Sequence, residues 1–239
     1  MRLFVLSEPL VEFCKALKGT GHTAPNPRPQ ACAAPPDCPP KLREYSRPTG
    51  GSVVGAVNEL SDGVVTLRAL TPTDAEVHLA GEDEPTVRFL SGGRSTMATV
   101  LAWIERNRLS REASGPVRSF GICLAATGTL VGVVEANLAT PGFRPGVANI
   151  SYGLYPGARG HGYATRAVEL MTRHLVDCTA AAIAAIQVHP ENPASARLPG
   201  RLSFRFLGER VTAEGERMLT YAKALRQPAE LRLADVCQP

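Results

Sequence analysis

Apolar and polar residues alternate regularly only from Gly63 onward, and this alternation predicts a series of β-strands. The run "VVTLRAL" alternates as a half-buried strand does. "SFGICLA" and "LVGVVEANLA", separated by a turn at Thr127-Gly128, predict a hairpin. Three further strands are predicted in "GVANISYGLYP", "FRFLGER" and "MLTYAKAL", and the apolar run "AAIAAIQVHP" predicts a buried strand.

Spacings of three and four residues predict helices between these strands. "TPTDAEVHLAGED" opens with Thr-Pro and acidic residues, which favour a helix start. In "STMATVLAWIERNRLSREA" a helix is predicted with one apolar face, made of Met97, Val100, Leu101, Ile104 and Leu109. Over residues 164–176 a second helix is predicted, with an inward face made of Ala167, Val168, Leu170, Met171 and Leu175. A short helix is predicted from Pro193, with Asn192 as its cap.

The order of these elements predicts the fold class. They follow one another as β-α-α-β-β-β-α-β-α-β-β, which is typical of an α+β fold. We expect a mixed, mainly antiparallel sheet with helices packed on both faces.

The composition of residues 1–60 differs from that of the rest of the chain, and it predicts an arm that lies outside this fold. The stretch from Pro25 to Pro48 is rich in proline and poor in large apolar residues, so it is expected to be extended or disordered. A docking segment for a partner and a start codon placed too far upstream are two open explanations. Four residues in this arm could in principle bind a metal, but their spacing matches no known site, so no metal is expected: Cys14, His22, Cys32 and Cys38.

Composition and charge limit the classes of partner that the protein is expected to bind. A net charge of +4 suits an anionic small molecule, whereas nucleic acid would require a concentrated basic face. No apolar stretch is long enough to span a membrane, and Glu8 and Pro9 interrupt the amino-terminal apolar run. The six cysteines include no CxxC pair, which argues against a zinc site and a disulfide framework. We therefore expect a cytoplasmic protein with no membrane or nucleic-acid partner.

The stretch "LYPGARGHGYATRAVELM" concentrates glycines between a strand and a helix. A helix amino terminus exposes unpaired N–H groups and favours phosphate. Gly160 and Gly162 would let a ligand approach the backbone closely. The spacing fits neither a dinucleotide-binding GxGxxG nor a Walker loop. A phosphate-binding loop and a plain glycine-rich connection both remain open.

Arg159-x-x-Gly162-x-Ala164 resembles the Q/R-x-x-G-x-G/A pyrophosphate loop of the GNAT superfamily of acyl-CoA-dependent N-acyltransferases. Around it, segments such as "SFGICLAATGTLVGVVEANL" and "HPENPASARLPGRLSFRFLGE" are similar to the RimJ/RimL-like, ribosomal-protein-alanine branch. The resemblance implies a GNAT domain over residues 61–226, with residues 227–239 as a tail. It also implies a central strand pair that splays apart, formed by the strands ending at Leu154 and Val188.

The resemblance further implies roles for individual residues. The backbone of Tyr152, Gly153 and Leu154 would pair with the pantetheine of acetyl-CoA. Asn192 and Ser195, in an N-x-x-S motif, would lie near the thioester. The pyrophosphate would be held by the loop that contains Arg159, through the N–H groups of Gly160, His161, Gly162, Tyr163, Ala164 and Thr165.

Several positions depart from the family pattern. Pro199-Gly200 lies inside the helix after Asn192, so that helix is expected to be short, kinked or broken. Pro199 also stands where other branches carry a tyrosine general acid. Ser203 replaces the usual glycine, and Asn149 replaces a common glutamate.

Acyl transfer to an amine requires a neutral nitrogen, and Glu135 is the best candidate for the base. The alternative is a surface-facing glutamate on an alternating strand. Ser195 could relay a proton to the thiolate or simply bond to backbone. An α-amine, with a pKa of about 7.7–8.0, needs less help from a base than a lysine at about 10.4.

The sequence therefore predicts an acetyl-CoA-dependent N-acetyltransferase. It would act on a peptide α-amine or a small amine by direct transfer in a ternary complex, with a homodimer left open. One alternative is a detoxifying transferase on the same scaffold. Another is a module that binds acyl-CoA without turnover, for sensing or interaction.

Overall fold

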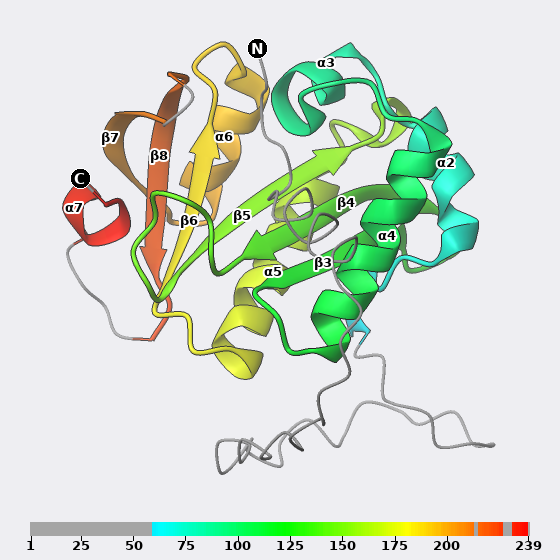
Figure 1. Cartoon of the computed structure of the whole chain (residues 1–239), viewed down its shortest axis with the longest axis horizontal. Coiled ribbons are helices and arrows are strands. Elements are labelled where there is room, and N and C mark those ends of the chain that lie inside the picture. The colour runs from blue at the N-terminus through cyan, green and yellow to red at the C-terminus, as the bar shows by residue number, and fades with distance from the viewer. Residues whose placement is uncertain (1–58, 213–214, 227–230, 239) are drawn as a thin grey trace, which may run out of the picture. The chain divides into compact units, whose positions relative to one another are not determined.

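The strands form one eight-stranded sheet in the order β1-β2-β3-β4-β5-β6-β8-β7 (Figure 1). The computed structural model describes residues 59–212, 215–226 and 231–238, so the proline-rich arm and its four candidate metal ligands lie outside the described residues. All neighbouring strands are antiparallel except β5 and β6, which are parallel. The strands are β1 (Leu60–Ser61), β2 (Val65–Arg68), β3 (Val117–Leu124), β4 (Leu130–Asn137), β5 (Val147–Leu154), β6 (Ile183–Val188), β7 (Arg205–Val211) and β8 (Arg217–Ala224).

Helices cover both faces of the sheet, as predicted for the α+β class (Figure 1). We call the face beneath α4 the front face and the face that packs on α5 the back face. The helical segments are η2 (Pro72–Asp74), α2 (Ala75–Ala80), α3 (Glu84–Thr86), the π-helical turn η3 (Val87–Ser91), α4 (Met97–Glu112), η4 (Pro156–Ala158), α5 (Tyr163–Cys178), α6 (Pro193–Arg201) and α7 (Leu233–Val236).

The parallel strands β5 and β6 pair only at their beginnings. The register joins residues 147–149 to residues 183–185 and then stops. Beyond Asn149, β5 stays paired with β4 as far as Leu154, and β6 stays paired with β8 as far as Val188. The two strands therefore splay apart, which confirms the predicted strand pair and leaves a slot between their carboxyl-terminal halves.

The predicted inward face of α5 is confirmed. Its five apolar residues are at most 3% exposed and join one core with the back of the sheet, including Leu67, Val134 and Ile150. Burying each large aliphatic side chain contributes about 1.5–3 kcal/mol to the stability of the folded state. This packing fixes the amino terminus of α5 beside the end of β5.

The predicted apolar face of α4 is partly wrong. Met97, Leu101 and Leu109 are 36%, 38% and 50% exposed. The buried positions are instead Val100, Trp103, Ile104 and Asn107. These four follow the spacing of one helical stripe. The prediction used only aliphatic residues and did not include polar Asn107. The predicted face was therefore rotated about the helix axis relative to the buried one.

The helix α6 is short, as expected, but Pro199 does not end it. The helix continues to Arg201, and the Pro199 carbonyl accepts the N–H groups of Leu202 and Phe204 at 3.1 and 3.0 Å. Ser203 then adopts a positive φ of 60°. This left-handed backbone is the conformation that glycine adopts most readily, so Ser203 occupies a position suited to glycine.

His174 on α5 predicts a pH-dependent stability. Its ring packs edge-on against Phe120, and both ring nitrogens are buried without a hydrogen-bond partner among the described residues. Burial, helped by Arg118 and opposed by Asp177, lowers the pKa of His174. The folded protein therefore binds this proton less readily than the unfolded chain. The contribution of neutral His174 to the free energy of unfolding is lost as pH falls below about 6.5, the pKa of histidine in the unfolded chain.

We expect His174→Leu to reduce the loss of stability at acid pH. For one proton, the free energy of unfolding changes by at most about 1.4 kcal/mol per pH unit. Urea unfolding of both proteins between neutral and acid pH measures the difference, which isolates His174 from the other titrating groups. Parallel stability curves for the two proteins would contradict this account of His174.

Candidate functional site

Among the described residues, no strand pairs with the edge of β5 that faces the slot beyond Asn149. The Tyr155 N–H donates to the Val131 carbonyl of β4 at 2.9 Å. Because backbone groups of successive residues in an antiparallel ladder point to alternate sides, those of Tyr152 and Leu154 are directed into the slot and those of Gly153 toward β4. The Leu154 carbonyl already accepts a bond from Arg159 Nε at 3.0 Å.

Helix α6 meets β5 across the back of the slot through Tyr152 and Ser195. The Tyr152 hydroxyl accepts a hydrogen bond from Ser195 Oγ at 2.8 Å and donates to the Ser195 carbonyl at 3.2 Å. Burial raises the pKa of Tyr152 to about 12, although the bond from Ser195 opposes this shift. Asn192 Oδ1 accepts the Ser195 N–H at 3.1 Å, which confirms Asn192 as the cap of α6. The structure therefore brings Tyr152, Asn192 and Ser195 together at one end of the slot.

The glycine loop between η4 and α5 presents a row of unpaired donors. Within the described chain, the backbone N–H groups of residues 160–165 have no hydrogen-bond acceptor. Gly160 and Gly162 adopt φ values of +81° and +78°, and a Cβ atom at either position would meet nothing within 4 Å. His161 Nδ1 lies 2.8 Å from the Arg159 carbonyl, and the His161 ring stacks on Tyr163. Unpaired N–H groups around left-handed glycines at a helix start suit an anion.

The Arg159 side chain is engaged by an acidic residue far away in the sequence. Its two terminal nitrogens contact the Asp83 carboxylate at 2.6 and 2.8 Å. The sequence predicts Arg159 as part of the anion-binding loop, and in the structure its guanidinium joins that loop to the segment that begins at Asp83.

Glu135 lies in the middle of the front face of the sheet. It is 7% exposed, so the alternative of a surface-facing glutamate is wrong. Burial raises the pKa of Glu135 to about 7, and nearby Trp103, Ser119 and Arg106 lower it by less. Trp103 Nε1, Ser119 Oγ and Glu135 Oε2 are all buried without a hydrogen-bond partner among the described residues. A carboxyl that titrates near neutral pH among unpaired polar groups is suited to accept a proton from a bound ligand.

The unpaired polar groups continue across the slot, which sequence reasoning missed. Ser119, Glu135 and Ser151 are paired neighbours on three strands, and Gln187 and Thr220 are paired neighbours on β6 and β8. The strand registers place all five side chains on the front face. Gln187 Nε2 and Thr220 Oγ1 are buried and without a partner among the described residues. The available signal was the single polar residue in the apolar run "AAIAAIQV".

Neither a metal cluster nor a membrane span is found in the described parts of the chain. No group of three His, Cys, Asp or Glu side chains in residues 59–212, 215–226 and 231–238 could hold a metal ion. The helices of the same residues lack the combination of length and apolarity that crossing a bilayer requires.

Solved structures of acetyltransferases share this fold. The ribosomal-protein-S5-alanine acetyltransferase from Vibrio fischeri is 15% identical, with a TM-score of 0.60 over 72% of this chain and 100% of that one. RimL, a ribosomal L7/L12 α-N-protein acetyltransferase in complex with coenzyme A, is 16% identical, with a TM-score of 0.58 over 70% and 98%. The microcin C7 self-immunity acetyltransferase MccE, in complex with acetyl-CoA and AMP, is 17% identical, with a TM-score of 0.58 over 69% and 93%. Comparison with curated protein sequences gave no match.

Family membership is shown by the sequence itself. The family model described as an acetyltransferase (GNAT) domain matches residues 65–205, which is more than half of the chain. This range includes the splayed strands, the glycine loop and Glu135. The chain belongs to the GNAT acetyltransferase family.

Proposed function

We propose that the protein is an acetyl-CoA-dependent N-acetyltransferase that moves the acetyl group directly to a primary amine in a ternary complex. The observation that carries the proposal is the row of N–H groups at residues 160–165, which have no acceptor in the described parts of the chain. They lie at the end of a slot where the described strands leave the edge of β5 unpaired. The loop would hold the diphosphate of acetyl-CoA, and the slot would hold its pantetheine arm.

The proposed contacts along β5 follow from its backbone. The polar groups of Tyr152 and the N–H of Leu154 would bond to the pantetheine amides, because the Leu154 carbonyl already accepts from Arg159. Gly153 has no side chain, so it would leave the front face of β5 bare at this point of the proposed binding slot. Asn192 would act by capping α6 and so fixing Ser195 beside the slot.

Glu135 is the proposed general base. With a pKa of about 7, part of its population is ionised at neutral pH and can accept a proton from the amine. A lysine side chain, with a pKa of about 10.4, would require about 3 kcal/mol more than an α-amine for deprotonation. We therefore propose an acceptor with a weakly basic amine, such as a peptide α-amine or a small amine.

Ser195 and Tyr152 are proposed to supply a proton to the departing thiolate. The Tyr152 pKa of about 12 keeps its hydroxyl protonated at neutral pH. To give its single proton to the thiolate, Ser195 Oγ would stop donating to Tyr152. The Tyr152 hydroxyl would turn from the Ser195 carbonyl and donate to Ser195 Oγ instead, so that its proton replaces the one that Ser195 gives up. Holding the two substrates together can itself supply about 7–11 kcal/mol of the barrier.

The second candidate is a module that binds acyl-CoA without turnover. The observation that favours it is Pro199, which stands where other GNAT branches carry a tyrosine acid. Thiol release from acetyl-CoA, measured against peptides with free α-amines, peptides with only lysine amines and small amines, separates the two. Release with α-amine or small-amine acceptors supports the transferase. Binding without release on any acceptor supports the module.

A further inference from the structure

A short segment crosses the front of the slot and contacts both of its rims. We call residues 83–91, comprising Asp83, α3 and η3, the strap. On the β5 side, a Cβ atom at Gly153 would lie 2.7 Å from Leu90 Cδ2, so the Leu90 side chain packs directly on Gly153 and would have to shift for any larger residue there. The strap thus closes directly over the strand whose backbone edge faces the slot.

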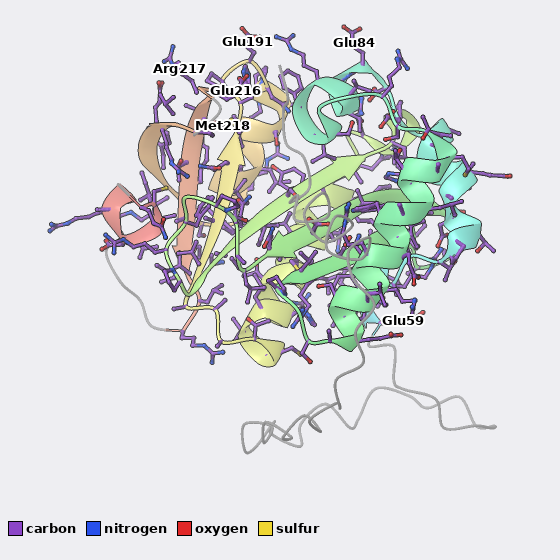
Figure 2. The ribbon with its side chains drawn as sticks, viewed as in Figure 1. Glu59, Glu84, Glu191, Glu216, Arg217 and Met218 are labelled. Atoms are coloured by element: carbon purple, nitrogen blue, oxygen red, sulfur yellow. The ribbon has the colours of Figure 1, made fainter. Side chains whose placement is uncertain are left out.

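The same turn of the strap, η3, also contacts residues that follow β6. The Phe89 ring lies 5.5 Å from the His189 ring, and Arg88 forms an ion pair with Glu191, just before α6. Figure 2 shows Glu84 of α3 and Glu191 at the same end of the sheet. The strap therefore bridges the two splayed strands.

Arg159 fastens the strap to the glycine loop. Its guanidinium forms a two-point ion pair with Asp83, and its Nη2 lies 3.4 Å from Thr86 Oγ1. Asp83 Oδ1 also caps α3 by accepting the Thr86 N–H at 3.1 Å. The Arg159 guanidinium, more than the Thr86 contacts, holds the pKa of Asp83 well below its usual range. The pair therefore stays charged at all pH values at which the protein would work.

The strap is built as a local, irregular element. Its last turn is π-helical, with the Gly92 N–H donating to the Val87 carbonyl at 3.0 Å, and Gly92 then adopts a φ of 66°. Single π-helical turns are rare and occur often at functional segments. Such an element depends on contacts at its ends. The Arg159–Asp83 pair joins opposite charges through two N–H···O contacts, which is the strong, two-point type of ion pair.

We propose that Arg159 is a positioning residue that latches the strap over the slot, so that acetyl-CoA affinity depends on the Arg159–Asp83 ion pair. This inference rests on the proposed function. Both terminal nitrogens and Nε of Arg159 already have protein partners, so its side chain acts through the strap rather than on the diphosphate. Only the latched fraction of molecules presents a closed slot, and the apparent Kd rises as that fraction falls.

Three variants separate the latch from a direct contact between Arg159 and the diphosphate: Asp83→Asn, Arg159→Gln and the double variant. Asn remains a good helix cap, so Asp83→Asn removes the ion pair and keeps the cap. We expect each single variant to raise the Kd of acetyl-CoA about three- to fivefold, and the double variant to do no more than either. Glu209→Gln, which breaks the Arg217 pair on the edge strand, is the matched control and should leave the Kd unchanged.

Amide hydrogen exchange of residues 83–91 without ligand provides a readout that does not depend on acetyl-CoA. We expect faster exchange in Asp83→Asn and Arg159→Gln than in the wild type and Glu209→Gln. A weaker Kd in Arg159→Gln alone, with Asp83→Asn binding as well as wild type, would overturn the latch, and so would unchanged exchange in Asp83→Asn. If the wild-type protein does not bind acetyl-CoA, the proposed function fails, and the exchange experiment alone decides whether the latch exists.

Discussion

The Gly162→Glu variant is expected to lose measurable binding of acetyl-CoA while remaining folded. Gly162 is the residue immediately before α5, and the space around its missing Cβ is open. A glutamate there would place a side chain and a negative charge where the diphosphate is proposed to lie. Isothermal titration calorimetry with acetyl-CoA measures the loss, and circular dichroism reports the fold.

The matched control for this variant is Gly128→Glu. Gly128 has a φ of +69° against +78° for Gly162, and neither has an atom within 4 Å of the missing Cβ. Both variants therefore carry the same new charge and a similar backbone strain of about 1–2 kcal/mol. Gly128→Glu should bind acetyl-CoA as wild type does. Wild-type affinity in Gly162→Glu would show that the loop does not hold the diphosphate.

Glu135→Gln is expected to lower kcat by about 10²–10³-fold, because it removes the proposed base without changing the size of the side chain. In the wild-type protein, kcat/KM should rise with pH through an apparent pKa near 7, where the Glu135 carboxyl of the free protein ionises. That dependence should be absent from the residual activity of the variant. Steady-state thiol release across a pH series measures both quantities.

Stability provides the control for Glu135→Gln. A raised carboxyl pKa means that the folded protein holds this proton more tightly than the unfolded chain, so stability falls as pH rises between about 4.3 and about 7. Gln cannot ionise, and the variant should be more stable than wild type at pH 8 by up to about 3 kcal/mol. A variant that gains stability and loses activity has lost chemistry rather than fold. Unchanged kcat in this more stable variant would remove Glu135 from the mechanism.

The sequence was sufficient for those parts of the fold that depend on local periodicity. The inward face of α5 was predicted residue by residue because its apolar positions recur every three or four residues against one sheet face. The strands β3 and β4 were predicted because a turn separates two alternating runs. The cap at Asn192 follows from the preference of its side chain for an exposed backbone N–H.

Two features that depend on distant contacts were not predicted: the strap and the polar front face of the slot. Asp83 and Arg159 are 76 positions apart, and nothing local marks either as a partner of the other. The strap has no regular period, since it combines a single α-helical turn with a π-helical one. The shared face of Glu135 and Gln187 depends on the registers of strands that are far apart in the sequence.

Calorimetric titration of the wild-type protein with acetyl-CoA and, separately, with S-acetyl-pantetheine tests whether the glycine loop holds the diphosphate of the acyl donor. The two ligands share the thioester and the pantetheine arm, and only acetyl-CoA carries the diphosphate proposed to bind the N–H groups of residues 160–165. We expect saturable binding of acetyl-CoA and much weaker binding of S-acetyl-pantetheine. Absence of acetyl-CoA binding, or equal affinity for the two ligands, would contradict this expectation.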